Sequence, residues 1–370
     1  MKTWDQGASR TPSSVAAHEI RANTAVDSLC DRAGRDRIVA SQPHGALHMS
    51  SIDRREFLVR SGSCAAHLAL ASASMPALMR AAWARSPLGS VVAREPFGSL
   101  EKVSDGVWAL ISTPLSGDRT TLSNGGIIAG TNAVLAIEGF NQPAGAAWLA
   151  ERARELTGRW PTHVALTHYH SDHANGVAGY MNASEHPSIR ATARTRDLVV
   201  ERNKPADTSR EAAVHDAVIL SPTDASVLDL GGRSVRVIPR LGHTESDLSL
   251  ELDDPSIVFC GDLFWNAMFP NYVDAIPTKL ATSVRALRRT RDTTYVPGHG
   301  AIGRAPQYDR YVAMLDEVEH AARKAFAAGQ SAADAGAAFA LPSSLGEWTL
   351  FNKSMYGTAF TAWYRELKST

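Results

Sequence analysis

Short apolar runs separated by turns rich in glycine and asparagine dominate the chain beyond residue 100, and this spacing predicts β-strands. In the first half we expect strands at residues 107–112, 126–129, 133–138, 163–167 and 188–193. Alanines and leucines recur at helical spacing between Pro143 and Gly158. Proline suits the first position of a helix and glycine the position after its end, so we expect a helix there.

A second group of strand-like runs follows and is flanked by helical patterns. We expect strands at residues 227–230, 235–239, 248–252 and 257–260, and helices at 195–202, 282–289 and 308–328. Residues 203–220, between the two groups, are charged and only weakly patterned, so we expect a loop or lid there. Two groups of strands flanked by helices suggest the α/β (α+β) class and a four-layer αββα sandwich.

Four potential metal ligands lie within six positions at the end of the expected strand 163–167: His168, His170, Asp172 and His173. In an extended chain His168 and His170 point to the same side, and the next two ligands come from the turn that follows. Nitrogen and oxygen donors at this density suit zinc or another first-row divalent metal, and the single carboxylate argues against calcium. A solvated histidine-rich loop that binds metal adventitiously is the alternative.

Three further candidate ligands, His243, Asp262 and His299, stand after expected strands in the second half, the last after a short strand at Tyr295. Each is flanked by small residues that let backbone segments approach closely. Each alone is typical of a polar surface loop, but together with the first four they predict one site at the strand ends. Cys260 lies two positions before Asp262 on an expected strand, and we expect it to be buried in the core.

This ligand pattern resembles that of the metallo-β-lactamase-fold hydrolase superfamily, over roughly residues 103–300 and with a set of the glyoxalase II type. The resemblance implies the αββα sandwich and two zinc ions, with iron or manganese as alternatives. It also implies seven ligands in two groups that share one aspartate. A first ion would be held by His168, His170 and His243, a second by Asp172, His173 and His299, and both by Asp262.

The resemblance further implies a hydroxide that bridges the two metals and attacks a carbonyl or phosphoryl centre. Asp172 and Asp262 are then the candidate catalytic residues, with Asp172 orienting the hydroxide or carrying a proton. We expect a hydrolase of a small ester, thioester, lactone or amide. β-Lactamase-like or phosphodiesterase activity and a non-catalytic metal-binding or sensing role are alternatives. True β-lactamases of this superfamily lack the bridging aspartate, and the glutathione-binding basic residues of glyoxalase II are not recognisable here.

Aromatic residues follow Asp262 closely, within residues 263–272, and recur near the C-terminus. The first group predicts either a rim that receives an apolar group or core packing beneath the site. The second group is expected to dock the last helix, with capping of the pocket as the alternative. It consists of Trp348, Phe351, Tyr356, Phe360 and Trp363.

Composition restricts the partners rather than the fold. The chain has 370 residues, of which 44% are hydrophobic, and its 38 basic residues balance 38 acidic ones. Such a balance gives no electrostatic reason to expect nucleic acid, and no apolar run is long enough for stable insertion into a membrane. We therefore expect a small-molecule substrate; the oligomeric state stays open.

The N-terminal region is expected to be removed or absent in the mature protein. Residues 1–48 are polar and aperiodic, and predict a disordered or wrongly annotated extension with the true start at Met49. Residues 49–84 resemble a twin-arginine (Tat) export signal: Arg54-Arg55, a weakly apolar stretch and the cleavage site Ala82-Trp83-Ala84. This predicts export by the Tat machinery and a periplasmic or secreted protein. The remainder divides into a metallo-β-lactamase-fold domain at 85–305 and a C-terminal helical extension packed on it at 306–370.

Overall fold

The computed structural model describes residues 89–369. The extension predicted at 1–48 and the signal predicted at 49–84 therefore lie outside the described residues. Within the described part of the chain, no helix is both long and apolar enough to cross a membrane.

The first of two sheets contains eight strands that follow one another in chain order. Its strands are antiparallel from β1 to β5 and parallel from β5 to β8. They are β1 (Ser90–Glu95), β2 (Gly98–Ser104), β3 (Val107–Ser112), β4 (Gly125–Ala129), β5 (Val134–Ile137), β6 (His163–Ala165), β7 (Ser188–Thr192) and β8 (Val218–Leu220).

The second sheet contains five strands in the order β13-β12-β11-β10-β9. β12 and β13 are parallel and the other neighbours are antiparallel, so β10, β12 and β13 all run in the same direction. The strands are β9 (Ser226–Asp229), β10 (Ser234–Arg240), β11 (Asp247–Leu252), β12 (Ile257–Phe259) and β13 (Thr294–Val296).

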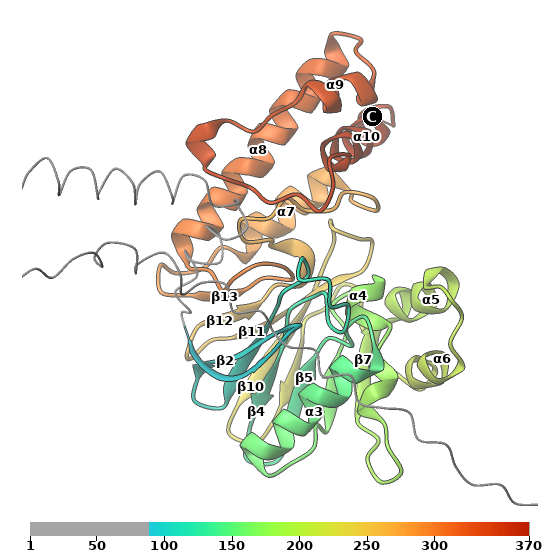
Figure 1. Cartoon of the computed structure of the whole chain (residues 1–370), viewed down its shortest axis with the longest axis vertical. Helices are drawn as coiled ribbons and strands as arrows, with labels where there is room; N and C mark the ends of the chain where they lie inside the picture. The colour runs from blue at the N-terminus through green and yellow to red at the C-terminus, as the bar shows by residue number, and fades with distance from the viewer. Residues whose placement is uncertain (1–88, 370) are drawn as a thin grey trace, which may run out of the picture. The chain divides into compact units, whose positions relative to one another are not determined.

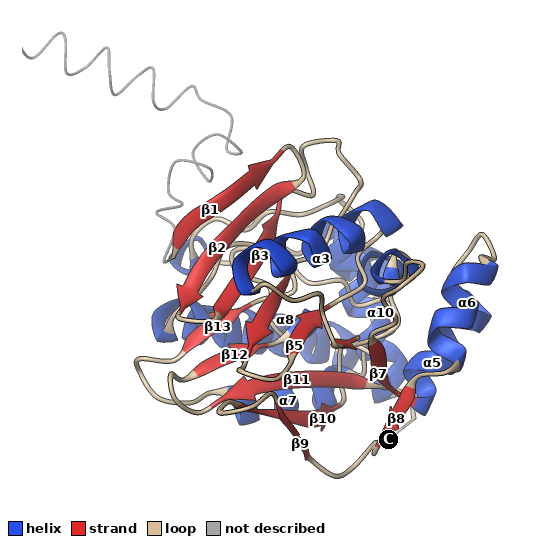
Figure 2. Cartoon of the chain, turned by 90° about the horizontal axis from the view of Figure 1, so that it is seen from below, coloured by secondary structure: helices blue, strands red, loops and turns tan. Residues whose placement is uncertain are grey.

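Helices cover the outer faces of both sheets (Figures 1 and 2). Those on the first sheet and its connections are α3 (Pro143–Thr157), α4 (Ser171–Ala174), α5 (Ala193–Arg202) and α6 (Thr208–His215). Those on the second sheet are α7 (Pro277–Leu287), α8 (Ala305–Ala327), α9 (Ala332–Ala338) and α10 (Met355–Leu367). Residues 89–369 also contain three short 3₁₀ turns: η1 (Val177–Tyr180), η2 (Gly261–Leu263) and η3 (Ser343–Leu345).

Alternating residues of the central strands explain the layers. Along β3, Val107 and Ala109 face the second sheet and pack with Leu250, whereas Trp108 and Leu110 face the helices on the other side. A strand whose two faces are both apolar must be covered on both, because successive side chains point to opposite faces of a sheet. The predicted αββα sandwich is thereby confirmed.

The predicted loop or lid at residues 203–220 is wrong for residues 208–215 and 218–220, which form α6 and the edge strand β8. Asp207 caps α6 by accepting a hydrogen bond from the backbone N–H of Arg210. The buried Arg210 guanidinium in turn donates to the carbonyls of Asn203 and Pro205. The charged residues of this segment thus stabilise a helix by hydrogen bonds to the backbone. Hydrophobic periodicity alone does not reveal such interactions.

Three other elements differ from expectation. Strands β1 and β2 were not expected, because β1 has no fully buried position and β2 alternates weakly. Helix α7 begins at Pro277, five residues before the expected start. Proline suits the first turn of a helix, because the backbone N–H that it lacks would have no intrahelical acceptor there.

The C-terminal helices share one apolar cluster with the second sheet and the segment after it. Val258 of β12, Tyr308 of α8 and Trp363 of α10 all belong to this cluster and are almost inaccessible to solvent. The segment that joins α9 to α10 therefore reaches the same edge of the sandwich as the strand ends described next.

Candidate metal centre

All seven predicted ligands lie on segments that leave strands at one edge of the sandwich. His168 and His170 follow β6, and α4 then carries Asp172 and His173. In the second sheet, β10, β12 and β13 run in the same direction and are followed by His243, Asp262 and His299, respectively. The two sheets thus deliver their ligands from opposite sides into one volume.

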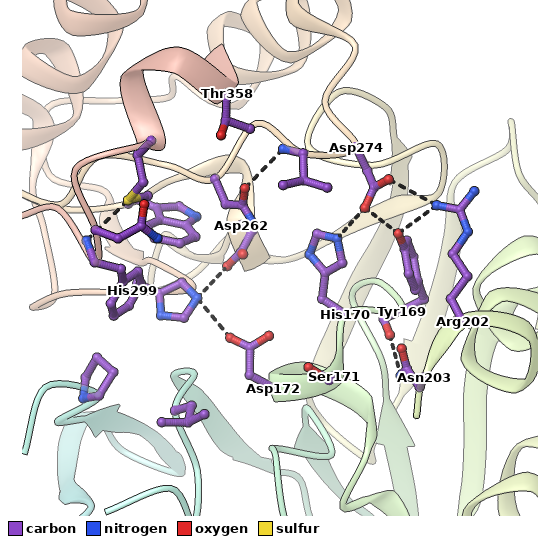
Figure 3. A pocket seen from close by; sticks show the side chains of 18 of the residues that line it. Tyr169, His170, Ser171, Asp172, Arg202, Asn203, Asp262, Asp274, His299 and Thr358 are labelled. Atoms are coloured by element: carbon purple, nitrogen blue, oxygen red, sulfur yellow. Dashed lines mark hydrogen bonds and ion pairs between the residues drawn. The ribbon is translucent and has the colours of Figure 1, made fainter. Parts of the chain in front are cut away.

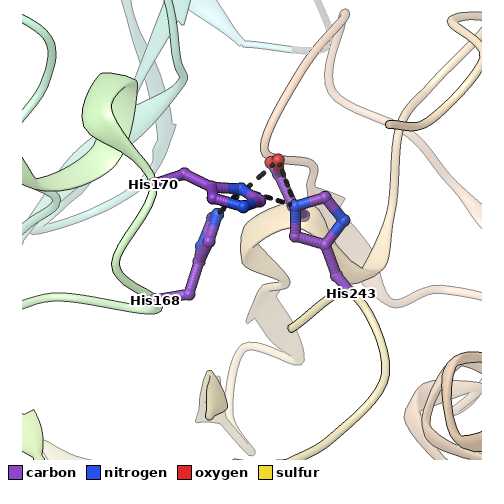
Figure 4. Close-up of side chains that lie close together, drawn as sticks. His168, His170 and His243 are labelled. Carbon is purple, nitrogen blue, oxygen red and sulfur yellow. Dashed lines mark hydrogen bonds and ion pairs between the residues drawn. The ribbon is translucent and has the colours of Figure 1, made fainter. Parts of the chain in front are cut away.

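The first donor group consists of His168, His170, His243 and Asp262, whose ligand atoms lie within 4.8 Å of one another. His170 Nδ1 lies 3.1 Å from His168 Nε2 and 3.0 Å from His243 Nε2. Asp262 Oδ2 lies 3.1 Å from His243 Nε2 and 3.7 Å from His168 Nε2. Figure 4 shows the three histidine rings turned toward one another.

The second donor group consists of Asp172, His173 and His299, and the other oxygen of Asp262 faces it. Asp262 Oδ1 lies 3.2 Å from His173 Nε2 and 3.4 Å from His299 Nε2. Asp172 Oδ2 lies 3.3 Å from His299 Nε2 (Figure 3). One buried carboxylate is therefore shared by both groups, one oxygen to each.

Outer hydrogen bonds fix the orientation of two of these rings. Thr167 Oγ1 donates to Glu138 Oε1, so it accepts from His168 Nδ1, 3.0 Å away. Asp274 Oδ2 lies 3.1 Å from His170 Nε2 and accepts its N–H. In both rings the proton is thereby placed on the outer nitrogen, and the inner nitrogen presents a lone pair to the centre.

Two atoms at the heart of the centre lack hydrogen bonds. His173 Nε2 and Asp262 Oδ1 are buried and 3.2 Å apart, yet they are not aligned for a hydrogen bond with each other or with another described group. Buried polar atoms without partners are rare in folded proteins and call for an explanation such as a bound ion. Converging imidazole lone pairs and carboxylate oxygens fit divalent first-row metals in both groups.

Electrostatics at the centre also suit cations. Burial, followed by neighbouring imidazoles, lowers the pKa of His168 well below its ordinary value, so this ring is neutral. At His299 the effect of burial is outweighed by Asp262 and Asp172, which raise its pKa to about 9. The surrounding imidazoles likewise overcome burial and hold the pKa of Asp262 well below its usual range. The carboxylates keep their charge, and binding of metal would displace the proton of His299.

Backbone geometry around Asp262 leaves no room for side chains. Gly261 has φ +51°, and a Cβ there would press on Thr167. A Cβ at Gly298 would overlap the Asp262 carboxylate itself. Both glycines are therefore required for the close approach of the strand ends that brings Asp262 between the two groups.

Several residues of the centre were not expected from the sequence. Glu138 follows β5, is 1% exposed, and adopts a left-handed φ of +74° while its carboxylate lies 3.0 Å from His173 Nδ1. Its place at the carboxyl end of a parallel strand was a signal that could have found it. Asp274 carries no such signal, because it lies in a long connection between η2 and α7.

The centre opens into a pocket of about 900 Å³. Of the aromatics within residues 263–272, only Trp265 lines the pocket, with its ring 4.0 Å from that of His299. Phe264, Phe269 and Tyr272 are buried in the core. Cys260 is also buried, as predicted.

The aromatic residues near the C-terminus divide between two roles. Phe360 and Trp363 dock α10 on the core, as expected for most of this group. Phe351 instead lies beside the centre, with its ring 5.7 Å from those of Trp265 and His299. Capping of the pocket, the alternative role, thus applies to this residue.

A four-layer αββα sandwich with paired histidine and aspartate donors at one edge defines a metal-dependent hydrolase. Consistent with this class, residues 139–299 match the family model described as "Metallo-beta-lactamase superfamily". The part of the chain that carries the seven candidate ligands is therefore similar to that superfamily.

Related chains are distant in sequence and include hydrolases. The chain is 24% identical to "Beta-lactamase-like protein 2 homolog" of Caenorhabditis elegans, over 60% of its own length and 69% of that protein. It is 26% identical to a hydroxyacylglutathione hydrolase of Yersinia enterocolitica, covering 37% of this chain and 46% of that one. It is 28% identical to the acyl-coenzyme A thioesterase MBLAC2 of Homo sapiens, covering 34% and 48%. The chain thus spans about half the length of these two enzymes.

Among solved structures, the chain resembles the sec-alkylsulfatase Pisa1 from Pseudomonas sp., with a TM-score of 0.58 and 15% identity. The match covers 73% of this chain and 50% of that one. At this identity the likeness concerns the fold alone.

Substitution of Asp274 tests the outer hydrogen bonds. We expect Asp274→Ala to weaken metal binding about 10- to 100-fold, because the outer nitrogen of His170 loses its acceptor. Competition with a chromogenic chelator measures the affinity. Asp197→Ala, on the exposed side of α5, is the control and should bind metal like the wild type. Equal affinities for the two variants would contradict the assigned role of Asp274.

Proposed function

We propose that this protein is a dinuclear zinc hydrolase that cleaves a small ester, thioester, lactone or amide. The observation that carries the proposal is the shared carboxylate of Asp262, with one oxygen 3.1 Å from His243 Nε2 and the other 3.2 Å from His173 Nε2. A carboxylate shared between two groups of histidine and aspartate donors is the arrangement expected for two adjacent metal ions. Iron and manganese are the alternatives to zinc, since the donor set suits all three.

Two divalent metals held by these residues would supply a nucleophile derived from water at neutral pH and a Lewis acid for the scissile group. The seven ligands would hold both ions, and Asp262 would contribute to both groups. Three carboxylates around the centre form no ion pair with arginine: Glu138, Asp172 and Asp262. The side chain of Asp172 is the most exposed of the three, at 24%, and it lines the pocket. In our proposal its carboxylate orients the nucleophile or carries a proton during the reaction.

Thioesters and other small acyl compounds are the preferred substrates in this proposal. The names of two relatives, a hydroxyacylglutathione hydrolase and an acyl-coenzyme A thioesterase, support that choice. Trp265 and Phe351 support it further, because they give the pocket an aromatic wall beside the donor groups on which an apolar acyl chain can pack.

Metal removal and substitution of Asp172 test the hydrolase proposal. We expect metal-replete protein to hydrolyse at least one of a panel of aryl ester, thioester, lactone, nitrocefin and bis-p-nitrophenyl phosphate. Chelation should abolish the activity and zinc should restore it. Asp172→Asn should lower kcat about 10²- to 10⁴-fold, as expected for loss of an acid–base group.

The control for this variant is Asp292→Asn, an exposed position before β13. It should keep wild-type kcat. Metal-replete protein that hydrolyses no member of the panel would favour the non-catalytic metal-binding alternative, and activity that survives full chelation would contradict metal dependence.

We also propose that the protein is exported by the Tat machinery and acts in the periplasm or outside the cell. The paired arginines Arg54 and Arg55 and the small-residue site Ala82-Trp83-Ala84 support this proposal. Mass spectrometry of the exported protein tests it: the mature chain should begin at residue 85, and Arg54→Lys with Arg55→Lys should abolish export. A mature chain that retains residues before Met49 would contradict this account of the N-terminus.

A further inference from the structure

The pocket over the metal centre has an unequal distribution of charge. Three carboxylates line it: Asp172, Asp262 and Asp274. The first two belong to the donor groups. Asp274 accepts hydrogen bonds from His170, Tyr169 and Arg202, and Figure 3 shows it between these three side chains. No lining carboxylate among the described residues therefore remains to balance another cation.

Two cations line the same pocket without a carboxylate of their own. Arg119 lies on the connection from β3 to β4, and Lys204 lies two residues after α5. Both are exposed, and within residues 89–369 neither side chain forms an ion pair. Arg202, which also lines the pocket, differs because its charge is paired with Asp274 at 3.0 Å.

Charges of one sign at a concave site attract an oppositely charged ligand more strongly than the same charges on an open surface, because the low-dielectric walls focus the field. Both cations are on loops at the mouth, whereas the donor groups are buried at the base. They are therefore positioned to contact a part of the substrate away from the bond that is cleaved.

Part of the remaining lining is apolar. Leu122, Trp265, Phe351 and Met355 come from three separate segments and line the pocket together. The ring of Trp265 lies 5.7 Å from that of Phe351 and 4.0 Å from that of His299. The pocket thus combines an apolar wall next to the donor groups with a cationic mouth.

We propose that the substrate is an acyl compound with a negatively charged group, and that Arg119 and Lys204 bind this group at the mouth of the pocket. The apolar part of the same substrate packs on Trp265 and Phe351, and the scissile carbonyl reaches the donor groups. This inference rests on the proposed hydrolase function. A carboxylate, sulfonate or phosphate on either side of the scissile bond meets the requirement.

Three thioesters that differ by one carboxylate test the inference. S-pentanoyl-N-acetylcysteamine is neutral, S-pentanoyl-N-acetylcysteine carries the charge on the thiol side, and S-glutaryl-N-acetylcysteamine carries it on the acyl side. We expect kcat/KM of metal-replete protein to be about tenfold higher for at least one charged thioester than for the neutral one, and this advantage to shrink with added salt.

The double variant Arg119→Gln/Lys204→Gln should lose this advantage while hydrolysing the neutral thioester at the wild-type rate. The matched control is Arg291→Gln/Lys324→Gln, which removes the same two charges at exposed positions outside the pocket. It should keep the wild-type preference.

Each outcome distinguishes the two proposals. Hydrolysis of all three thioesters with no preference for charge, or with a preference that survives in the double variant, would overturn the anion site and leave the hydrolase intact. An equal loss for charged and neutral thioesters in the double variant would also overturn it, since the two side chains would then act on the fold or the metals. No hydrolysis of any thioester by metal-replete wild type would overturn thioesterase activity and the inference built on it.

Discussion

The buried carboxylate of Asp262 is the constraint on which the rest of this structure depends. It is 4% exposed and has histidine nitrogens of both donor groups around it. Taking a charged group out of water is costly unless opposite charge and hydrogen bonds compensate it. Imidazoles alone do so incompletely, because Oδ1 has no hydrogen bond. Two cations would complete the compensation, and the glycines at 261 and 298 provide the space in which the strand ends meet around this side chain.

The sandwich serves this arrangement by aligning strand ends from two sheets. A rigid core between the sheets, with residues such as Leu250 and Phe259 almost fully buried, fixes the distance between His168 and His243, which come from different sheets. Much of the lining of the pocket comes from the connections between the elements instead. The segments after β3 and α5 supply its mouth, and the segments after η2 and before α10 supply its aromatic wall. Reaction type and substrate choice are thus assigned to different parts of the fold.

The sequence predicted the parts of the molecule that have a local pattern. Strand β3 was expected with its observed bounds, because its first five residues are all apolar. The closely spaced histidines and aspartate after β6 indicated the metal centre. The roles of Asp274 and Arg202 could not be predicted, because they arise only when segments 72 positions apart in the sequence meet in space. Strand β1 was missed because its partly exposed edge gives little hydrophobic signal. Phe351 was grouped with residues that dock α10, since periodicity does not tell a pocket wall from a core.

Metal stoichiometry tests the central claim most directly. Elemental analysis of the purified protein, combined with anomalous scattering from crystals, should find two metal ions per chain, one at each donor group. Asp262→Ala should reduce the content to one ion or less, because both groups lose an oxygen ligand. A wild-type protein that binds a single ion at saturating metal, or an Asp262→Ala variant that keeps two, would contradict the shared-carboxylate account.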